Sequence, residues 1–151
     1  MLCLPGQSRL YLFGGICQEP MTNMAFFETS QNKNIGDYQV LEAATQTGLE
    51  TIKGVFGFGS CTYNGKLYYF FGALGYDRRL KLRNCTSQAI KFNPNTRNYS
   101  QIQLWHEPER LLIPRRYPTM LCVGKDLLCL GGINRQGYGL KELLCIDMNT
   151  Y

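Results

Sequence analysis

The residue types that usually carry enzymatic chemistry are sparse in this sequence. His106 is the only histidine, which argues against a Ser-His-Asp triad and against a metal site with several histidine ligands. Glu107 and Glu109 flank Pro108, and no helical face brings a pair of carboxylates together for acid/base work. The glycine-rich run 54–60 lacks the lysine and hydroxyl spacing of a phosphate-binding loop. We therefore expect no catalytic residue, cofactor or metal ligand.

Arginine and tyrosine gather instead in segments that are expected to be loops. Residues 78–83 contain four cations within six positions, and Tyr76 lies beside them. Arginine and tyrosine dominate interaction hot spots, and the formal net charge of +5 favours acidic partners. We predict a basic rim that binds an acidic segment of a partner protein. The candidate residues are Tyr76, Arg78, Arg79, Lys81, Arg83, Arg115, Arg116, Asn134, Arg135 and Tyr138.

The elements that must position these loops follow from an internal repeat. Three segments, 9–16, 67–74 and 126–133, are each an apolar strand closed by two small residues. Aligned on Gly14, Gly72 and Gly131, the copies lie 58 and 59 residues apart. Small residues at a strand end let the backbone turn sharply or let a neighbouring chain approach. The chain is therefore predicted to repeat one structural unit.

Each unit is predicted to contain four short strands joined by hairpins. Asn64-Gly65 is a type I′ hairpin signature, and it is aligned with Val123-Gly124 in the third copy. The turns 93–96 and 147–150 share an Asx-x-x-Thr pattern, in which the first side chain accepts a hydrogen bond from the backbone two residues on. The remaining strands are expected at 24–27, 38–41, 60–63, 89–92, 99–104, 119–123 and 143–146.

Two connectors separate the three units, which span approximately 1–53, 54–112 and 113–151. Residues 41–52 are interpreted as a connector in preference to a short helix, and the proline-rich segment 104–118 is its counterpart. Four-stranded units at this spacing are typical of β-propeller blades. The predicted fold is all-β, a partial propeller of about two and a half to three four-stranded antiparallel units.

With these motifs the sequence resembles the kelch-repeat family, whose blades carry a glycine doublet after the second strand. The resemblance covers nearly the whole chain and rests on three features: the doublets Gly14-Gly15, Gly72-Ala73 and Gly131-Gly132, the run 63–68 before the second doublet, and the turn 147–150 followed by Tyr151. It implies a non-catalytic protein-binding platform. The alternative is the remnant of a propeller enzyme, of the sugar isomerase or oxidase type, whose site lies mostly in other blades. A third interpretation is the binding of RNA by the loop 78–83, which offers positive charge and Tyr76 for stacking.

The number of units predicts that the chain does not close a ring alone. It is expected to begin just before the second strand of its first unit, while a ring needs four to eight blades. We expect a fragment of a longer propeller or, less readily, a chain that assembles with copies of itself through open edges and apolar faces. Seven cysteines without a Cys-x-x-Cys pair, and no signal peptide or apolar span, indicate a cytoplasmic protein with mostly buried thiols.

Overall fold

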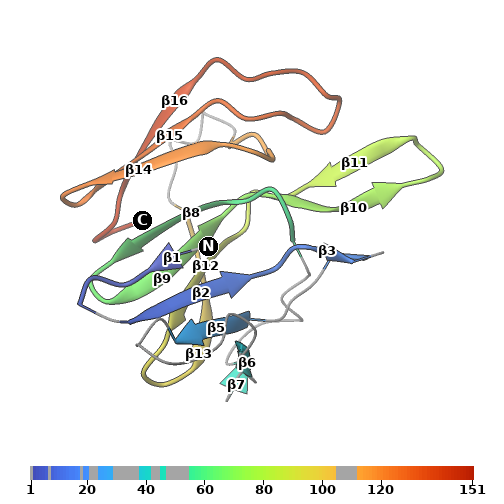
Figure 1. Ribbon diagram of the computed structural model, residues 1–151. Coiled ribbons are helices and arrows are strands. Elements are labelled where there is room, and N and C mark those ends of the chain that lie inside the picture. Colours follow the sequence, from blue (N-terminus) through green and yellow to red (C-terminus); the bar gives the residue numbers. More distant parts are fainter. Residues whose placement is uncertain are drawn as a thin grey trace.

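The computed structural model describes residues 2–6, 8–17, 19–20, 24–28, 38–41, 45–46, 55–104 and 112–151. These residues form strands, turns and loops and no helix, so the predicted all-β class is confirmed. The strands pair antiparallel with a single parallel exception, and within the described ranges none of the sheets closes on itself (Figure 1). The same ranges contain no helix of the length and apolar character needed to cross a membrane.

Three main sheets follow one another along the chain, and we call them the first, second and third sheets. The first has the order β1 (Leu2–Cys3), β2 (Arg9–Phe13), β5 (Met24–Glu28), β6 (Tyr38–Leu41). The second has the order β7 (Thr45–Gln46), β13 (Asn98–Ile102), β12 (Ala89–Asn93), β9 (Lys66–Phe70), β8 (Gly59–Tyr63). The third has the order β14 (Thr119–Val123), β15 (Asp126–Leu130), β16 (Leu143–Asp147). Two small hairpins join β3 (Ile16–Cys17) to β4 (Glu19–Pro20) and β10 (Ala73–Asp77) to β11 (Leu82–Cys85).

The turn chemistry read from the sequence is confirmed where the backbone is described. Asn64 and Gly65 both have positive φ, 46° and 67°, as the type I′ hairpin between β8 and β9 requires. In the turn after β12, the Asn93 side chain accepts the N–H of Asn95 at 3.0 Å. The equivalent turn after β16 repeats this bond at 2.9 Å, from the N–H of Asn149 to Asp147.

Three details of the predicted units are wrong. The first sheet already contains its first strand, since β1 pairs with β2. Residues Thr45–Gln46, predicted as connector, form β7, which pairs parallel with the outer strand β13 of the second sheet. The third hairpin turns at Gly124 and Lys125, because Val123 pairs with Asp126, and this is one residue later than the alignment predicts.

The second and third units match at a spacing of 60 residues. An isolated bridge joins Phe56 to Ala73 in one unit and Arg116 to Ile133, 60 positions further on, in the next. Each bridge is closed by two reciprocal backbone hydrogen bonds of 2.8–3.1 Å. β8 and β14 likewise begin 60 residues apart. The structural repeat is therefore one residue longer here than the glycine alignment predicts.

The shift arises at the doublet. Two successive left-handed residues end the second strand of each unit: Gly14 and Gly15 (φ 64° and 107°), Phe71 and Gly72 (64° and 108°), and Gly131 and Gly132 (64° and 99°). The second doublet is thus Phe71-Gly72, and the predicted pair Gly72-Ala73 is wrong. A bulky residue in this conformation costs about 1–2 kcal/mol. Burial of the Phe71 ring, which is 2% exposed, offsets that cost.

The doublets let neighbouring backbones approach, as the sequence predicts. A Cβ on Gly14 would lie 2.4 Å from the Val55 carbonyl oxygen of the second unit. The Gly15 N–H donates to this carbonyl at 3.0 Å, and the Gly72 N–H donates to the Arg115 carbonyl of the third unit at 2.7 Å. Successive units are therefore joined by the same backbone hydrogen bond.

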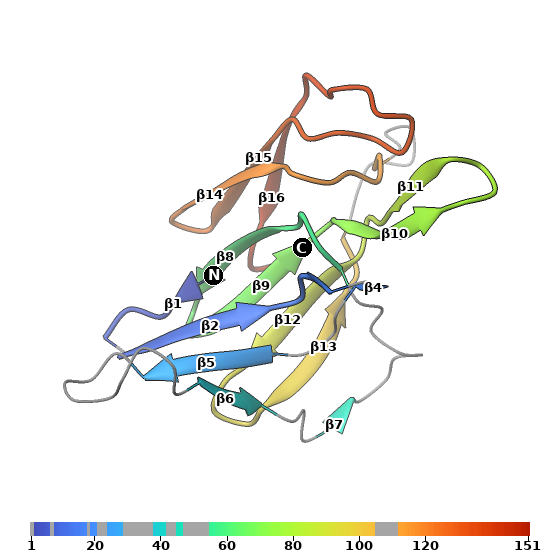
Figure 2. The same ribbon diagram turned by 45° about the vertical axis from the view of Figure 1, so that its right-hand side comes forward.

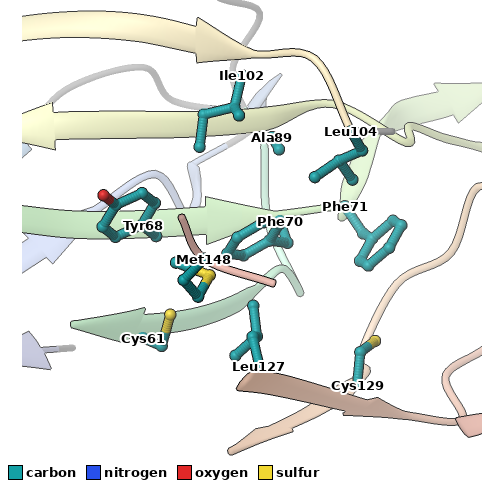
Figure 3. Packing of buried hydrophobic residues seen from close by; sticks show 10 residues of the cluster. All are labelled: Cys61, Tyr68, Phe70, Phe71, Ala89, Ile102, Leu104, Leu127, Cys129 and Met148. Carbon is teal, nitrogen blue, oxygen red and sulfur yellow. The ribbon is translucent and has the colours of Figure 1, made fainter. Parts of the chain in front are cut away.

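Two apolar clusters hold the sheets together, and the second sheet lies between them. One cluster joins Leu4, Tyr11 and Phe13 of the first unit to one face of the second sheet. The other cluster joins the opposite face of the second sheet to the third unit. Leu127, Cys129 and Met148 of the third unit pack there against the other residues labelled in Figure 3. Figure 2 shows the resulting order of the sheets in space, with the third sheet on one side of the second and the first sheet on the other.

Candidate functional site

The hairpin β10–β11 carries the cations of the second unit on a projecting ribbon (Figures 1 and 2). Its tip is fixed by Asp77, whose Oδ1 accepts the backbone N–H groups of Arg79 and Leu80 at 2.9 and 3.0 Å. Because these bonds tie the backbone of the turn, the side chains of Arg78, Arg79 and Lys81 point from an ordered turn into solvent. The Asp77 carboxylate is the feature that the sequence analysis missed, although an Asx residue before a turn is a recognisable signal.

An aromatic and cationic stack supports the base of this hairpin. Tyr76 is 53% exposed and lies opposite Arg83 in the register of β10 and β11. The Arg83 guanidinium carbon lies 5.9 Å from the centre of the Tyr76 ring and 5.4 Å from that of the buried Phe56. These distances are those of cation–π contacts, so the orientation of Arg83 is restricted on two sides.

The loop of the third unit is closed by its own hydrogen bonds. The side-chain oxygen of Asn134 accepts a hydrogen bond from the Tyr138 N–H at 2.9 Å, and the backbone N–H of Asn134 donates to the Tyr138 carbonyl at 3.0 Å. The Gly137 N–H donates to the Asn134 carbonyl at 3.1 Å. This small ring of bonds presents Tyr138, the most exposed large hydrophobic side chain of the described residues at 71%, and half-exposed Arg135.

The structure brings the two loops together. Arg135 Nη2 lies 3.9 Å from Asp77 Oδ2, and the Cys85 thiol at the end of β11 lies 3.9 Å from the Ile133 carbonyl. On the other side β4 of the first unit contacts β10. We call the hairpin 73–85 and the loop 133–140 the basic loop surface. It contains five cations, four in the hairpin and one in the loop, against the single carboxylate of Asp77.

The two predicted connector arginines lie elsewhere. Arg115 is 0% exposed, and we remove it from the predicted binding surface. Its guanidinium donates to the carbonyls of Ile113 and Gly131 at 3.1 Å each and to the Glu142 carboxylate, and it lies 5.0 Å from the centre of the Phe71 ring. With every face occupied in this way, the Arg115 side chain is unavailable to a partner. Its hydrogen bonds lie within the third unit, and its contact with Phe71 reaches the second unit.

Arg116 is half-buried between the two units and borders the basic loop surface. Its guanidinium carbon lies 5.9 Å from the centre of the Tyr117 ring, and its Nη1 is buried without a hydrogen-bond partner. Burial raises the pKa of the neighbouring Cys85 thiol, and the positive charge of Arg116 opposes that rise. Arg116 therefore lies at the edge of the surface. Arg110, His106 and the glutamates beside it lie outside the described residues.

Cys61, Cys85, Cys122, Cys129 and Cys145 are free thiols. Cys61 and Cys129 are buried, as expected, whereas Cys3 and Cys145 are exposed. Burial raises the pKa of Cys61 to about 12 and that of Cys129 to about 11, so neither is an activated nucleophile. Over the part of the chain that the structure describes, no three His, Cys, Asp or Glu side chains gather closely enough to hold a metal ion.

The arrangement can bind carboxylates through exposed guanidinium groups and offers exposed tyrosine rings beside them. No protein-family model matches the chain, and no curated protein is significantly similar to it. The fold and the surface therefore define this protein as an all-β chain of successive antiparallel sheets with a basic, tyrosine-bearing loop surface.

Proposed function

We propose that this chain is a non-catalytic protein-interaction module, built from kelch-like blades of a partial β-propeller, that binds an acidic segment of a partner protein. The observation that carries the proposal is the contact between Arg135 and Asp77, because it places the cations of two successive units on one surface. The free cysteines agree with a module of the reducing cytoplasm.

The propeller interpretation is supported by what successive units share. The same backbone hydrogen bond, from the second doublet residue to a carbonyl of the next unit, occurs at Gly15 and at Gly72. The first strands of the three sheets are neighbours, since β8 contacts both β1 and β14. In a propeller the first strand of each sheet lies nearest the common axis and the faces of neighbouring sheets pack together. The loops after each doublet then emerge on one side, where β4, β10 and the loop of the third unit meet.

The binding interpretation is supported by the chemistry of the basic loop surface. Guanidinium groups form bidentate hydrogen bonds with carboxylates, and tyrosine rings contribute large contact area at low entropic cost. The turn that carries Arg78 and Arg79 is ordered by Asp77, so less conformational freedom is lost on binding. Most of these charges are exposed, so we expect the attraction to weaken strongly as salt is added.

The test is the binding of a short fluorescein-labelled peptide of glutamate and aspartate residues, followed by fluorescence anisotropy. The double variant Arg78→Glu/Arg79→Glu should bind the peptide at least about tenfold more weakly, because each exposed pair contributes up to about 1 kcal/mol and reversal adds repulsion. The matched control is Lys66→Glu/Arg97→Glu. It makes the same change of charge at the hairpin turns of β9 and β12, at the opposite end of the second sheet.

Equal weakening by both pairs of substitutions would show attraction to net charge alone and would contradict a defined surface. Unchanged binding by Arg78→Glu/Arg79→Glu would remove the hairpin from the proposal. Tighter binding of single-stranded RNA than of the peptide would replace an acidic protein by a nucleic acid as the partner.

A further inference from the structure

The third sheet has one face that no other described part of the chain covers. Successive side chains of β15 point to opposite faces of the sheet, so Leu127 and Cys129 face the second sheet, whereas Leu128 and Leu130 face away from it. On the uncovered side Leu121, Val123, Leu130 and Leu143 are between 54% and 60% exposed. We call this the outer face of the third sheet. Four large aliphatic side chains this exposed on one sheet face are unusual for an isolated soluble domain.

The second sheet shows what covers an equivalent face. In its register, Gly59 pairs with Phe70 and Phe70 pairs with Ala89. The third sheet repeats this row, because Thr119 pairs with Leu130 and Leu130 pairs with Leu143.

The two equivalent rows differ completely in exposure. Phe70 and Ala89 are 0% and 1% exposed, whereas their counterparts Leu130 and Leu143 are 54% and 60% exposed. The row of the second sheet is covered by Leu127 and other residues of the third unit. The outer face of the third sheet therefore has the form of an interface that is occupied one unit earlier in the same chain.

The chain also carries a face of the covering type at its other end. Leu127 and Cys129, which cover the second sheet, lie four and two residues before the first left-handed glycine of their doublet. Leu10 and Leu12 lie at the same two positions before Gly14 in β2. Both are half-buried and point away from Tyr11 and Phe13, the β2 side chains that contact the second sheet.

We propose that the chain of residues 1–151 associates head to tail, with the outer face of the third sheet of one copy packed on the Leu10 and Leu12 face of the first sheet of a second copy. The contact continues the packing that already joins the second sheet to the third. The two faces are different, so the interface is heterologous, and it closes into a ring or extends according to the rotation between copies.

The experiment is sedimentation velocity over a series of concentrations of the purified chain. The unchanged chain should sediment as a dimer or larger assembly at high concentration. Leu143→Glu should raise the dissociation constant at least about tenfold, because it places a charge in the apolar centre of the contact. Leu80→Glu is the matched control, since Leu80 is equally exposed, at 54%, but lies on the β10–β11 turn. It should leave association unchanged.

Mixing two variants tests the head-to-tail arrangement directly. Leu143→Glu and Leu10→Glu should each be monomeric alone, yet a mixture should form a heterodimer, since each copy keeps one intact face. Far-UV circular dichroism and the thermal midpoint establish that each variant is folded, and Leu121→Glu replaces Leu143→Glu if that variant unfolds.

A monomeric unchanged chain at all concentrations would overturn the proposal and leave the face to a further unit or another protein. Persistent assembly of folded Leu143→Glu would exclude the third sheet from the contact. Failure of the mixture to associate would overturn the pairing of unlike faces. Leu10, Leu121 and Leu143 lie outside the basic loop surface, so failure of this proposal leaves the proposed function untouched. Leu80→Glu, which lies on that surface, shows whether the surface takes part in the association.

Discussion

Replacement of buried Arg115 by methionine is expected to destabilise the chain by about 3 kcal/mol. The change deprives the part-buried Ile113 and Gly131 carbonyls of their donors, and an acceptor left unsatisfied on burial costs about 1–3 kcal/mol. The Glu142 side chain is 36% exposed, so water replaces the lost ion pair there and the full cost of breaking a buried pair is avoided. Methionine retains part of the packing against Phe71.

Urea unfolding followed by circular dichroism measures this loss. With a slope of about 2 kcal/mol per molar urea, the midpoint of Arg115→Met should fall by about 1.5 M. Arg116→Met is the matched control, because Arg116 is the next residue, is only half-buried and has an Nη1 without a hydrogen-bond partner. Its cost should stay below about 1 kcal/mol. Equal midpoints for the two variants would refute the argument that the buried contacts of the Arg115 side chain stabilise the chain.

Three further predictions follow from individual contacts. Gly14→Ala should destabilise the chain by about 1–3 kcal/mol more than Gly15→Ala in the same urea assay, because both glycines have positive φ but only at Gly14 does the new Cβ meet a carbonyl oxygen, at 2.4 Å; equal losses would contradict a close approach. The hydrogen bond from Lys125 holds the pKa of Asp147 below its usual range, so the stabilisation is complete above the unfolded pKa of about 4 and is lost as the pH falls through the folded value. The thermal midpoint of Asp147→Asn should accordingly lie below that of the unchanged chain at pH 7, with a difference that shrinks in acid; a difference that grows in acid would reverse the sign of the argument. Iodoacetamide labelling mapped by mass spectrometry should modify the exposed thiols in the folded chain and Cys61 only after unfolding, and early labelling of Cys61 would contradict its burial.

Most strands of the three main sheets, though not β1 and β7, and the turns at 64–65, 93–96 and 147–150 were predictable from the sequence because their signals are local. Asn64-Gly65 supplies the two positive φ values that its hairpin needs, and Asn93 and Asp147 close their turns with their own side chains. The internal repeat of an apolar run closed by two small residues located the second strand of each unit, β2, β9 and β15, to within a few residues.

The alignment of the repeats failed where tertiary packing overrides local preference. Alignment of the sequences places Gly72 opposite Gly14 and Gly131, whereas the residue with the equivalent positive φ is Phe71. Phe71 adopts this left-handed conformation because its ring is buried beneath Arg115. The burial of Arg115 was hidden for a similar reason. Nothing in the adjacent pair Arg115-Arg116 distinguishes the residue whose partners, Gly131 and Glu142, lie 16 and 27 residues further along the chain.

The candidate surface was predicted in its composition but not in its construction. The exposed residues Arg78, Arg79, Lys81 and Tyr138 lie on loops as predicted, and the two loops lie side by side. The contribution of Asp77 to both the turn and the contact with Arg135 depends on distances between units, which no single segment of sequence encodes.

The most direct test of the repeated architecture is an NMR measurement of couplings across backbone hydrogen bonds. The account predicts a coupling from the Gly15 amide nitrogen to the Val55 carbonyl carbon and an equivalent coupling from Gly72 to Arg115, because the same bond joins each pair of successive units. Detection of both would establish that the two junctions are alike. Absence of either coupling, together with rapid exchange of its amide proton, would contradict the claim that one unit is repeated with one mode of packing.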